Sequence, residues 1–277
     1  MTFSIVAMDD TGAWGVAVAS KFLAVGAAVP TVHAGVGAVA TQAMANLRFG
    51  PDGMALLQQG MTAQQVVDAL MAGDDEREHR QLGVVDAHGG AATATGVSCM
   101  AWAGGVSGPG YAIQGNILTG EDVVIAMERA LLASAGRPMP QRLLAALRAG
   151  DEAGGDRRGR QSASLLVGRR GAGYGGGSDI EVDLRVDDHV DPVSELDRLF
   201  GIHELLFGKP TSTMPLSGDA ASRLRAALDA LGYREPDLEA ALFACAGVEN
   251  LEERLVPGEL DPVVLEYLEG LVIERRA

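Results

Sequence analysis

Thr2-Phe3-Ser4-Ile5-Val6-Ala7 and Trp14-Gly15-Val16-Ala17-Val18-Ala19 stand on either side of the sequence Asp9-Asp10-Thr11-Gly12. Both outer runs are short and rich in apolar residues, which is typical of buried strands. Asp, Thr and Gly between two such runs are typical of a tight turn. The N-terminus therefore predicts a β-hairpin in which the first residue after the initiator methionine is a threonine.

Paired strands and paired helices alternate through the next part of the chain. Strand-like runs pair as Val25–Val29 with Val36–Thr41, Leu82–Ala87 with Ala91–Gly96, and Ser162–Val167 with Ile180–Val186. Helices are expected after Gly50-Pro51, from the capping box Thr62-x-x-Gln65 to Gly73, from Thr119, from Pro140 until Gly150 stops it, and from Asp191-Pro192. This order predicts an α+β fold: a four-layer αββα sandwich of two antiparallel sheets with helices on both outer faces.

The C-terminal quarter of the chain has a different pattern. Residues 209–216 read Lys-Pro-Thr-Ser-Thr-Met-Pro-Leu, a composition typical of a linker. Beyond them, Ser217, Pro236 and Asp261-Pro262 each mark the start of a helix. The sequence thus predicts a main domain at residues 1–208, a linker at 209–216 and a small all-α domain at 217–277.

Charge and composition argue against several function classes. The chain has 22 Lys and Arg against 37 Asp and Glu, so its net charge of −15 argues against binding to nucleic acid or to an anionic membrane surface. The N-terminus lacks the basic region of a secretory signal, and Pro30 and His33 interrupt the apolar stretch Leu23–Ala45. The two cysteines, Cys99 and Cys245, fit a reducing compartment. We therefore expect a cytoplasmic protein.

Thr2 has a specific chemistry if Met1 is removed, which happens readily when the second residue is small. The new terminus then has a hydroxyl and a free α-amine on one residue, and such an amine has a pKa of about 7.7–8.0. The amine can accept the hydroxyl proton and later protonate a leaving amine, as in N-terminal threonine catalysis. Thr is also common after an initiator methionine, so Thr2 alone does not decide the function.

Four further segments resemble the family called domain of unknown function 1028, which is placed among the N-terminal-nucleophile (Ntn) hydrolases. They are Arg80-Gln-Leu-Gly-Val-Val-Asp86, Gly108-Pro-Gly-Tyr-Ala-Ile-Gln-Gly-Asn116, Gly154-Gly-Asp-Arg-Arg-Gly-Arg-Gln-Ser-Ala163 and Asp183-Leu-Arg-Val-Asp-Asp-His189. The third segment is long and unusual, so it is the most specific. The resemblance covers about residues 2–210 and implies a fold and a nucleophile but no substrate.

The layout also resembles a proteasome-type subunit, in which a glycine-rich turn before a helix lies beside the nucleophile. The resemblance implies that this turn is Gly108–Asn116 and that a later Asp supports the nucleophile. The implied catalytic residues are Thr2 as nucleophile, Asn116 as an oxyanion donor and Asp156 as the group that orients Thr2. The chain departs from the pattern in the second strand, where proteasome subunits have an Asp and this chain reads Val18-Ala19-Ser20. Their buried Lys also has no obvious counterpart.

Nine residues are candidates for substrate binding: Gln42, Asn46, Gly108, Gly110, Gln114, Arg157, Arg160, Gln161 and Ser162. The backbone amides of the two glycines would complete the oxyanion site, and an Arg can bind a substrate carboxylate with two hydrogen bonds. The alternatives are structural. A charge run is typical of a solvated loop, Gln42 and Asn46 follow a strand as loop or cap residues do, and Gly-Asn is typical of a turn.

The acidic segment near residue 188 permits a second interpretation, a metal-dependent hydrolase that uses Asp187, Asp188 and His189. Hard oxygen ligands at close spacing suit a divalent cation. We favour a strand end followed by a helix cap at Asp191, and we expect no metal or other cofactor. A third interpretation is a non-catalytic protein that binds peptides or cell-wall fragments.

Residues 217–277 resemble a helical domain known as the putative peptidoglycan binding domain, which is appended to some members of the same family. The resemblance lies in Leu224-x-x-x-Leu228-x-x-Leu231-Gly-Tyr233 and Asn250-Leu-Glu-Glu-Arg254. This pattern is mostly helix periodicity, so an oligomerisation or packing unit is the alternative. We expect the protein to hydrolyse a small amide or short peptide and, by resemblance, to form a homodimer or larger homo-oligomer.

Overall fold

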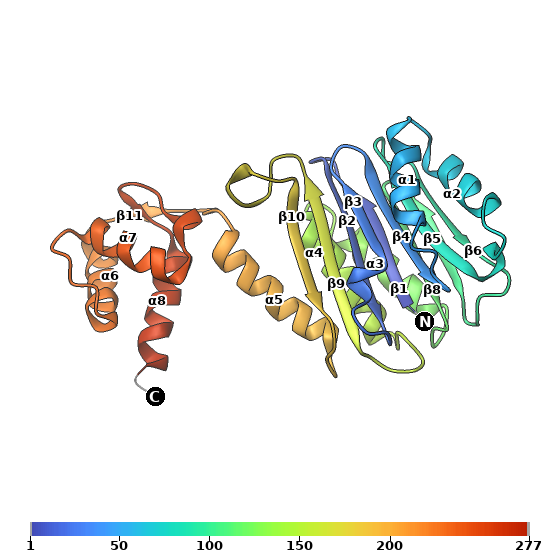
Figure 1. Cartoon of the computed structure of the whole chain (residues 1–277). Coiled ribbons are helices and arrows are strands. Elements are labelled where there is room, and N and C mark those ends of the chain that lie inside the picture. Colours follow the sequence, from blue (N-terminus) through green and yellow to red (C-terminus); the bar gives the residue numbers. More distant parts are fainter. Residues whose placement is uncertain (1, 276–277) are drawn as a thin grey trace. The chain divides into compact units, whose positions relative to one another are not determined.

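Two antiparallel sheets form the body of the first of two compact units, in a computed structural model that describes residues 2–275 (Figure 1). The larger sheet has the strand order β10-β9-β2-β1-β8-β7 and the smaller one the order β3-β4-β5-β6. The strands of the larger sheet are β1 (Thr2–Met8), β2 (Ala13–Ser20), β7 (Gly104–Gly108), β8 (Tyr111–Asn116), β9 (Ser162–Arg169) and β10 (Ile180–Val186). Those of the smaller sheet are β3 (Pro30–His33), β4 (Gly37–Ala43), β5 (Arg80–Asp86) and β6 (Ala91–Thr95).

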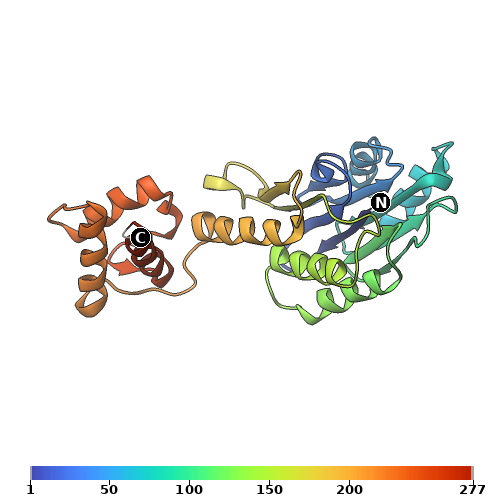
Figure 2. The same ribbon diagram turned by 90° about the horizontal axis from the view of Figure 1, so that it is seen from below.

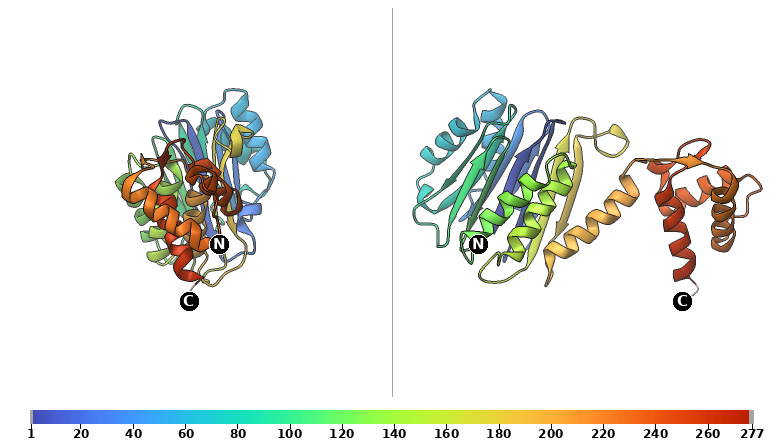
Figure 3. Two further views of the ribbon diagram at one scale, coloured as in Figure 1. Left: turned by 90° about the vertical axis from the view of Figure 1, so that its left-hand side faces the viewer. Right: turned by 180° about the vertical axis from the view of Figure 1, so that it is seen from behind.

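Two pairs of helices cover the outer faces of the sheets. The helices α1 (Phe49–Gln58) and α2 (Ala63–Ala72) pack on β4, β5 and β6, whereas α3 (Asp122–Ala133) and α4 (Met139–Glu152) pack on β8, β1, β2 and β9. Figure 2 shows the two pairs on opposite sides, and Figure 3 shows α3 and α4 across the larger sheet. These layers confirm the predicted αββα sandwich.

Local sequence signals explain several of these elements. The predicted capping box is present, because the Thr62 hydroxyl accepts from the Gln65 amide and the Gln65 side chain accepts from the Thr62 amide. Apolar residues at helical spacing, such as Leu143 and Leu147 of α4, are fully buried against the larger sheet. Between the sheets, small and β-branched side chains including Val16, Val32 and Val85 form an apolar core.

Three local predictions are wrong. Val25–Val29 is not a strand: Ala24 is left-handed and Val25–Ala27 form a 3₁₀ turn, so the paired strand starts at Pro30. Thr119 does not cap α3, whose N-cap is Glu121; the Thr119 amide donates to the Gly155 carbonyl. Gly150 does not stop α4, which continues to Glu152.

The second compact unit comprises the residues from Phe200 onward, so its boundary lies inside α5 (Pro192–Phe207). Its helices are α6 (Gly218–Leu231), α7 (Leu238–Glu249) and α8 (Pro262–Glu274), close to the three predicted starts. Part of the expected linker, β11 (Met214–Pro215), pairs with β12 (Glu259–Leu260). A buried ion pair joins Arg254 to Asp261 at 2.6 Å.

The short 3₁₀ turns η2 (Arg77–His79), η3 (Tyr174–Gly176) and η4 (Glu252–Arg254) complete the described structure, besides η1 (Val25–Ala27). Among residues 2–275, none of the helices combines the length and the apolar character that crossing a bilayer requires.

Gly150 offers a test of the packing between α4 and its neighbours. A Cβ at this position would lie 2.7 Å from Cγ of Met127 and 3.2 Å from Cε2 of Phe3. We expect Gly150→Ala to lower the free energy of unfolding by about 1–3 kcal/mol through overpacking, although alanine favours helix. Chemical denaturation would measure the change. Gly120→Ala, where the Cβ meets nothing within 4 Å, is the control. A neutral or stabilising Gly150→Ala would contradict the packing argument.

Candidate active site

Thr2 begins a strand in the interior of the larger sheet, where β1 lies between β2 and β8. It pairs with Asn116 of β8, and its Oγ1 lies 3.1 Å from Oγ of Ser20 at the end of β2. The Thr2 residue is only 6% exposed. Met1, whose removal the nucleophile hypothesis needs, lies outside the described residues 2–275. The strand ends thus hold the Thr2 hydroxyl at a fixed, largely buried position.

Side-chain alternation places Thr2 and Ser4 on the face of β1 that looks toward the smaller sheet. The Ser4 hydroxyl donates to Oε1 of Gln42 on β4 at 2.6 Å. Nε2 of Gln42 donates to Oε1 of Gln81 on β5 at 2.7 Å and lies 3.4 Å from the Thr2 carbonyl oxygen. Gln42 therefore links the two sheets directly beneath Thr2.

A second set of amides extends this network. Nδ2 of Asn116 donates to Oε1 of Gln81 at 2.9 Å, and Nε2 of Gln81 donates to the Gly115 carbonyl at 2.7 Å. Nε2 of Gln114 donates to the Ser4 hydroxyl at 2.6 Å. We call Ser4, Gln42, Gln81, Gln114 and Asn116 the amide network.

The amide network corrects three predictions. Gln42, Gln114 and Asn116 are 1%, 0% and 2% exposed, and their amide nitrogens donate to protein acceptors. The predicted substrate contacts of Gln42 and Gln114 are therefore wrong, and the Asn116 amide is committed to Gln81 rather than to an oxyanion. These side chains fix the strands that carry Thr2.

The carboxylate of Asp156 binds neighbours of Thr2's partner residues and not Thr2 itself. Its Oδ2 accepts from the amide of Lys21 at 2.7 Å, and its Oδ1 accepts from the amide of Arg158 at 2.8 Å. Lys21 directly follows Ser20, so Asp156 holds the end of β2 that contacts Thr2. The expected direct orientation of Thr2 becomes an indirect one. Nζ of Lys21 donates to the Arg160 carbonyl at 3.3 Å.

The residues after Asp156 have mostly structural partners. Arg160 binds Asp151 through Nε and Nη2 at 2.9 and 2.8 Å, and this pairing raises the pKa of its guanidinium. Gln161 donates to Asp188 at 3.1 Å. The buried Ser162 hydroxyl donates to the Phe22 carbonyl and accepts from the Val25 amide. Ser162 is fully buried and Arg160 is paired with Asp151, so neither offers an unpaired group, and a substrate contact of either residue stays a prediction.

Arg157 differs from these neighbours. Its amide donates to the Ile117 carbonyl at 3.3 Å, directly after the Asn116 that pairs with Thr2. The side chain is exposed, and within residues 2–275 its guanidinium has no hydrogen-bond or ion-pair partner. Arg157 thus remains available for a ligand.

The predicted glycine-rich turn lies at the other end of the sheet. Gly108 and Gly110 belong to the β7–β8 hairpin, where the Gly110 carbonyl accepts from the amide of Met8. Met8 is the last residue of β1 and Thr2 is the first, about 20 Å apart in an extended strand. Placing the glycines beside Thr2 is therefore wrong. The glycine-rich segment 171–177 follows β9 at this same far end.

Three loops that the sequence did not single out lie at the Thr2 end. Each contains a non-glycine residue in the left-handed region: Ala24 (φ 52°) after β2, Ala43 (φ 70°) at the end of β4, and Ile117 (φ 50°) after β8. Such backbone is uncommon and often marks functional sites. After Ala43, the amides of Ala45 and Asn46 donate to no acceptor among residues 2–275. They follow Gln42, which reaches the Thr2 carbonyl, by three and four residues and are candidate donors.

A buried ion pair supports the loop after β4. Arg80 binds Asp74 at 3.0 Å and also donates to the Met44 carbonyl. The hydrogen bond from Arg80, aided by one from Asn46, holds the pKa of Asp74 below its ordinary value. Nδ2 of Asn46 donates to Asp74 at 2.7 Å and its Oδ1 accepts from the Arg48 amide, so its side chain has a cap role rather than a substrate contact.

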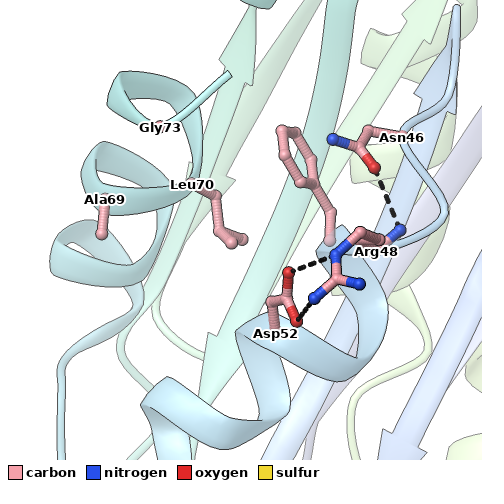
Figure 4. A pocket seen from close by; sticks show the side chains of 7 residues that line it. Asn46, Arg48, Asp52, Ala69, Leu70 and Gly73 are labelled. Carbon is pink, nitrogen blue, oxygen red and sulfur yellow. Dashed lines mark hydrogen bonds and ion pairs between the residues drawn. The ribbon is translucent and has the colours of Figure 1, made fainter.

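A hollow of about 330 Å³ lies next to this loop, between the start of α1 and the end of α2 (Figure 4). Asn46, Arg48, Asp52 and Leu70 are among its lining residues, and Arg48 forms an exposed ion pair with Asp52 at 3.3 Å. The groups that line it are already paired with each other, so the hollow adds room beside the loop but no free ionic group.

The acidic segment does not gather as a metal site. Asp188 accepts from Gln161, and Nδ1 of His189 accepts from the Asp191 amide at 3.0 Å. In the part of the chain that the structure describes, no three His, Cys, Asp or Glu side chains are grouped so as to hold a metal ion. The arrangement is that of a strand end and a helix start.

The amide network can be tested by stability. Gln42→Met keeps the side-chain length but leaves the Ser4 hydroxyl proton without its acceptor and removes one of the two donors to Oε1 of Gln81. Because an orphaned buried group costs about 1–3 kcal/mol and a lost hydrogen bond about 0.5–1.5 kcal/mol, we expect a loss of roughly 2–4 kcal/mol in unfolding free energy. Denaturant titration would measure it, with the exposed Gln64→Met as control. Equal stability of the two variants would show that the network does not hold the sheets together.

Comparison with known proteins agrees with this architecture. Residues 2–196 match the family described as "Family of unknown function (DUF1028)", and residues 205–268 match the family described as "Putative peptidoglycan binding domain". A search of curated proteins finds no match.

Two solved structures are similar to the chain. The crystal structure of protein SPO2555 from Silicibacter pomeroyi, a DUF1028 protein, is 30% identical, with a TM-score of 0.66 over 80% of this chain and 92% of that one. Anbu (ancestral beta-subunit) from Yersinia bercovieri is 14% identical, with a TM-score of 0.34 over 72% of this chain and 93% of that one. The family match over most of the chain and the identity to SPO2555 show that this chain belongs to the DUF1028 family.

Proposed function

We propose that the protein is an amide hydrolase whose nucleophile is the hydroxyl of Thr2, exposed as the N-terminal residue when Met1 is removed. The observation that carries the proposal is the position of Oγ1 of Thr2. It lies at the first residue of an interior strand, 3.1 Å from Oγ of Ser20, above a buried amide network. Hydroxyl nucleophiles need such rigid support. A substrate that is a small amide or short peptide fits this proposal.

In this mechanism the α-amine of Thr2 is the general base. It takes the proton of Oγ1 as this oxygen attacks the carbonyl carbon, and it returns the proton to the leaving nitrogen as the C–N bond breaks. Water then attacks the ester on Thr2 and gives a proton to the amine, which passes it to Oγ1 of Thr2 as the acid leaves. Nζ of Lys21 points to the Arg160 carbonyl, so the proposal assigns no role in this transfer to lysine.

The amides of Ala45 and Asn46 are the donors that we assign to the oxyanion. They follow the left-handed Ala43 at the end of β4, and they are unpaired within residues 2–275. Gln42, the residue before Ala43, reaches the Thr2 carbonyl. A donor of this kind typically contributes roughly 2.7–4 kcal/mol to the transition state. Arg80, through its bond to the Met44 carbonyl, holds these amides in place.

Intact mass spectrometry tests the nucleophile. We expect the purified protein to lack the mass of one methionine and to gain one adduct from a β-lactone probe. Thr2→Ala should abolish the adduct, because the hydroxyl is gone, while Thr2→Ser should keep it. Ser164→Ala, which removes a buried hydroxyl of β9 outside the amide network, is the matched control and should still be labelled. Retained Met1 without any adduct would exclude this mechanism.

The pH dependence of labelling tests the base. An α-amine with a pKa of about 7.7–8.0 accepts a proton only in its neutral form. We therefore expect the labelling rate to rise about tenfold per pH unit below that range and to level off above it. Stopped reactions between pH 5.5 and 9.5 would give the profile. A rate that is flat across this range would argue that the amine is not the base.

A non-catalytic function has one specific observation in its favour, the match of residues 205–268 to a peptidoglycan binding family. In that case the protein holds a peptide or cell-wall fragment without cleaving it. Retention of Met1 together with binding of soluble muropeptides would favour this alternative. We assign no reaction to Asp187, Asp188 and His189.

A further inference from the structure

The loops around Thr2 expose an unusual number of large apolar side chains. Six of them are between 55% and 87% exposed, and we call this set the apolar collar: Phe22, Leu23, Met44, Leu47, Val97 and Met100. Exposed apolar side chains are ordinary when scattered, but a group around one point marks a binding surface.

Three members of the apolar collar are linked, along the chain or by a backbone hydrogen bond, to residues that contact or directly follow the partners of Thr2. Phe22 lies two residues after Ser20, whose hydroxyl is 3.1 Å from the Thr2 hydroxyl. Met44 lies two residues after Gln42, which reaches the Thr2 carbonyl. The Met100 carbonyl accepts from the amide of Ile117 at 2.9 Å, directly after the Asn116 that pairs with Thr2. The collar therefore surrounds the proposed nucleophile from three strands.

Side-chain hydrogen bonds to backbone carbonyls hold two of the collar loops in place. The Ser162 hydroxyl donates to the Phe22 carbonyl, and Arg80 donates to the Met44 carbonyl. Apolar side chains on anchored loops stay exposed to water and cannot fold back into the core. Contact of these side chains with water is unfavourable in free energy, and a bound apolar ligand would remove part of that contact.

Two cations stand beside the collar. Lys21 directly precedes Phe22, and Arg157 is bonded through its amide to the carbonyl of Ile117. Within residues 2–275 neither side chain pairs with an acidic group, although the protein carries a net charge of −15. An unpaired cation at each site can bind a carboxylate.

We propose that the substrate is an N-acyl amino acid, with its apolar acyl chain on the collar and its carboxylate at Lys21 or Arg157. This inference rests on the proposed function, because it specifies which amide Thr2 would cleave. A second copy of this chain is a poorer occupant of the collar. A two-fold contact would bring the same face of each copy together, and both copies present the cations Lys21 and Arg157 on that face.

Equilibrium binding to the Thr2→Ala protein tests the inference without any need for catalysis. Calorimetry would compare N-octanoylglycine with N-acetylglycine, which differ by six methylenes. Full burial gains about fourfold per methylene, so burial of even a third of the chain predicts at least a tenfold tighter Kd for the octanoyl ligand. N-octanoylglycinamide, which lacks the carboxylate, should bind at least fivefold more weakly than N-octanoylglycine.

Double substitutions test where on the protein the acyl chain and the carboxylate bind. In the Thr2→Ala background, Met44→Ser with Leu47→Ser should reduce the octanoyl preference to less than threefold. Tyr174→Ser with Ile180→Ser, two exposed apolar residues at the far end of the sheet, should leave the preference unchanged. Arg157→Gln with Lys21→Gln should remove the difference between the acid and its amide.

Three outcomes would overturn the inference. The first is equal binding of octanoyl and acetyl ligands. The second is an octanoyl preference that survives the Met44 and Leu47 substitutions, and the third is conversion of a dimer to a monomer by those substitutions with ligand binding unchanged. Binding is measured without the Thr2 hydroxyl, so the two tests are independent. Absence of the β-lactone adduct would contradict the proposed function but not a positive binding result. An adduct together with equal binding of the octanoyl and acetyl ligands would support the proposed function and contradict the substrate inference.

Discussion

The bond between Gln42 and Gln81 at 2.7 Å is the contact on which the Thr2 end of the fold depends. A buried amide must find its partners, so the two glutamines fix how β4 and β5 lie under β1 and β8. Gly83 is part of this constraint, because a Cβ there would lie 2.2 Å from Oε1 of Gln114. The polar layer therefore specifies the backbone beside it as well as the side chains within it.

The space between the sheets is divided in two. At the far end it is filled by apolar residues such as Val16, Val32 and Val85, whose burial drives the sheets together. At the Thr2 end it contains amides and hydroxyls, which contribute little net free energy but have strict geometry. Oε1 of Gln114 has no partner among the described residues, a cost typically of about 1–3 kcal/mol. Apolar side chains at this end would have given a more stable fold. The polar layer instead fixes the positions of the strand ends around Thr2.

Sequence patterns predicted the elements better than the site. Apolar alternation, the Thr62 capping box and turn residues are local signals, and they gave the αββα fold and the N-terminal hairpin. The roles of Gln42 and Gln114 were missed because covered sheets bury both faces of an interior strand, so a polar residue within it points into a network and not to solvent. Gly108 was misplaced because the hairpin turn lies at the opposite end of β8 from Asn116. The left-handed Ala43 carries no sequence signal, since alanine seldom adopts that conformation.

In the proposed mechanism the α-amine of Thr2 activates the Thr2 hydroxyl without help from a lysine. The contact between Thr2 and Ser20 explains how an amine of ordinary basicity can do so. Each hydroxyl has one proton to donate and two lone pairs. If Ser20 donates across the 3.1 Å contact, the Thr2 proton is left for the α-amine and its second lone pair for the carbonyl carbon. The same hydrogen bond stabilises the oxygen as it loses its proton, which favours transfer to a weak base. Asp156 keeps Ser20 at this distance by binding the amide of Lys21, the next residue. In the proposed mechanism, Ser20 thus supports the Thr2 hydroxyl without adding a charge beside it.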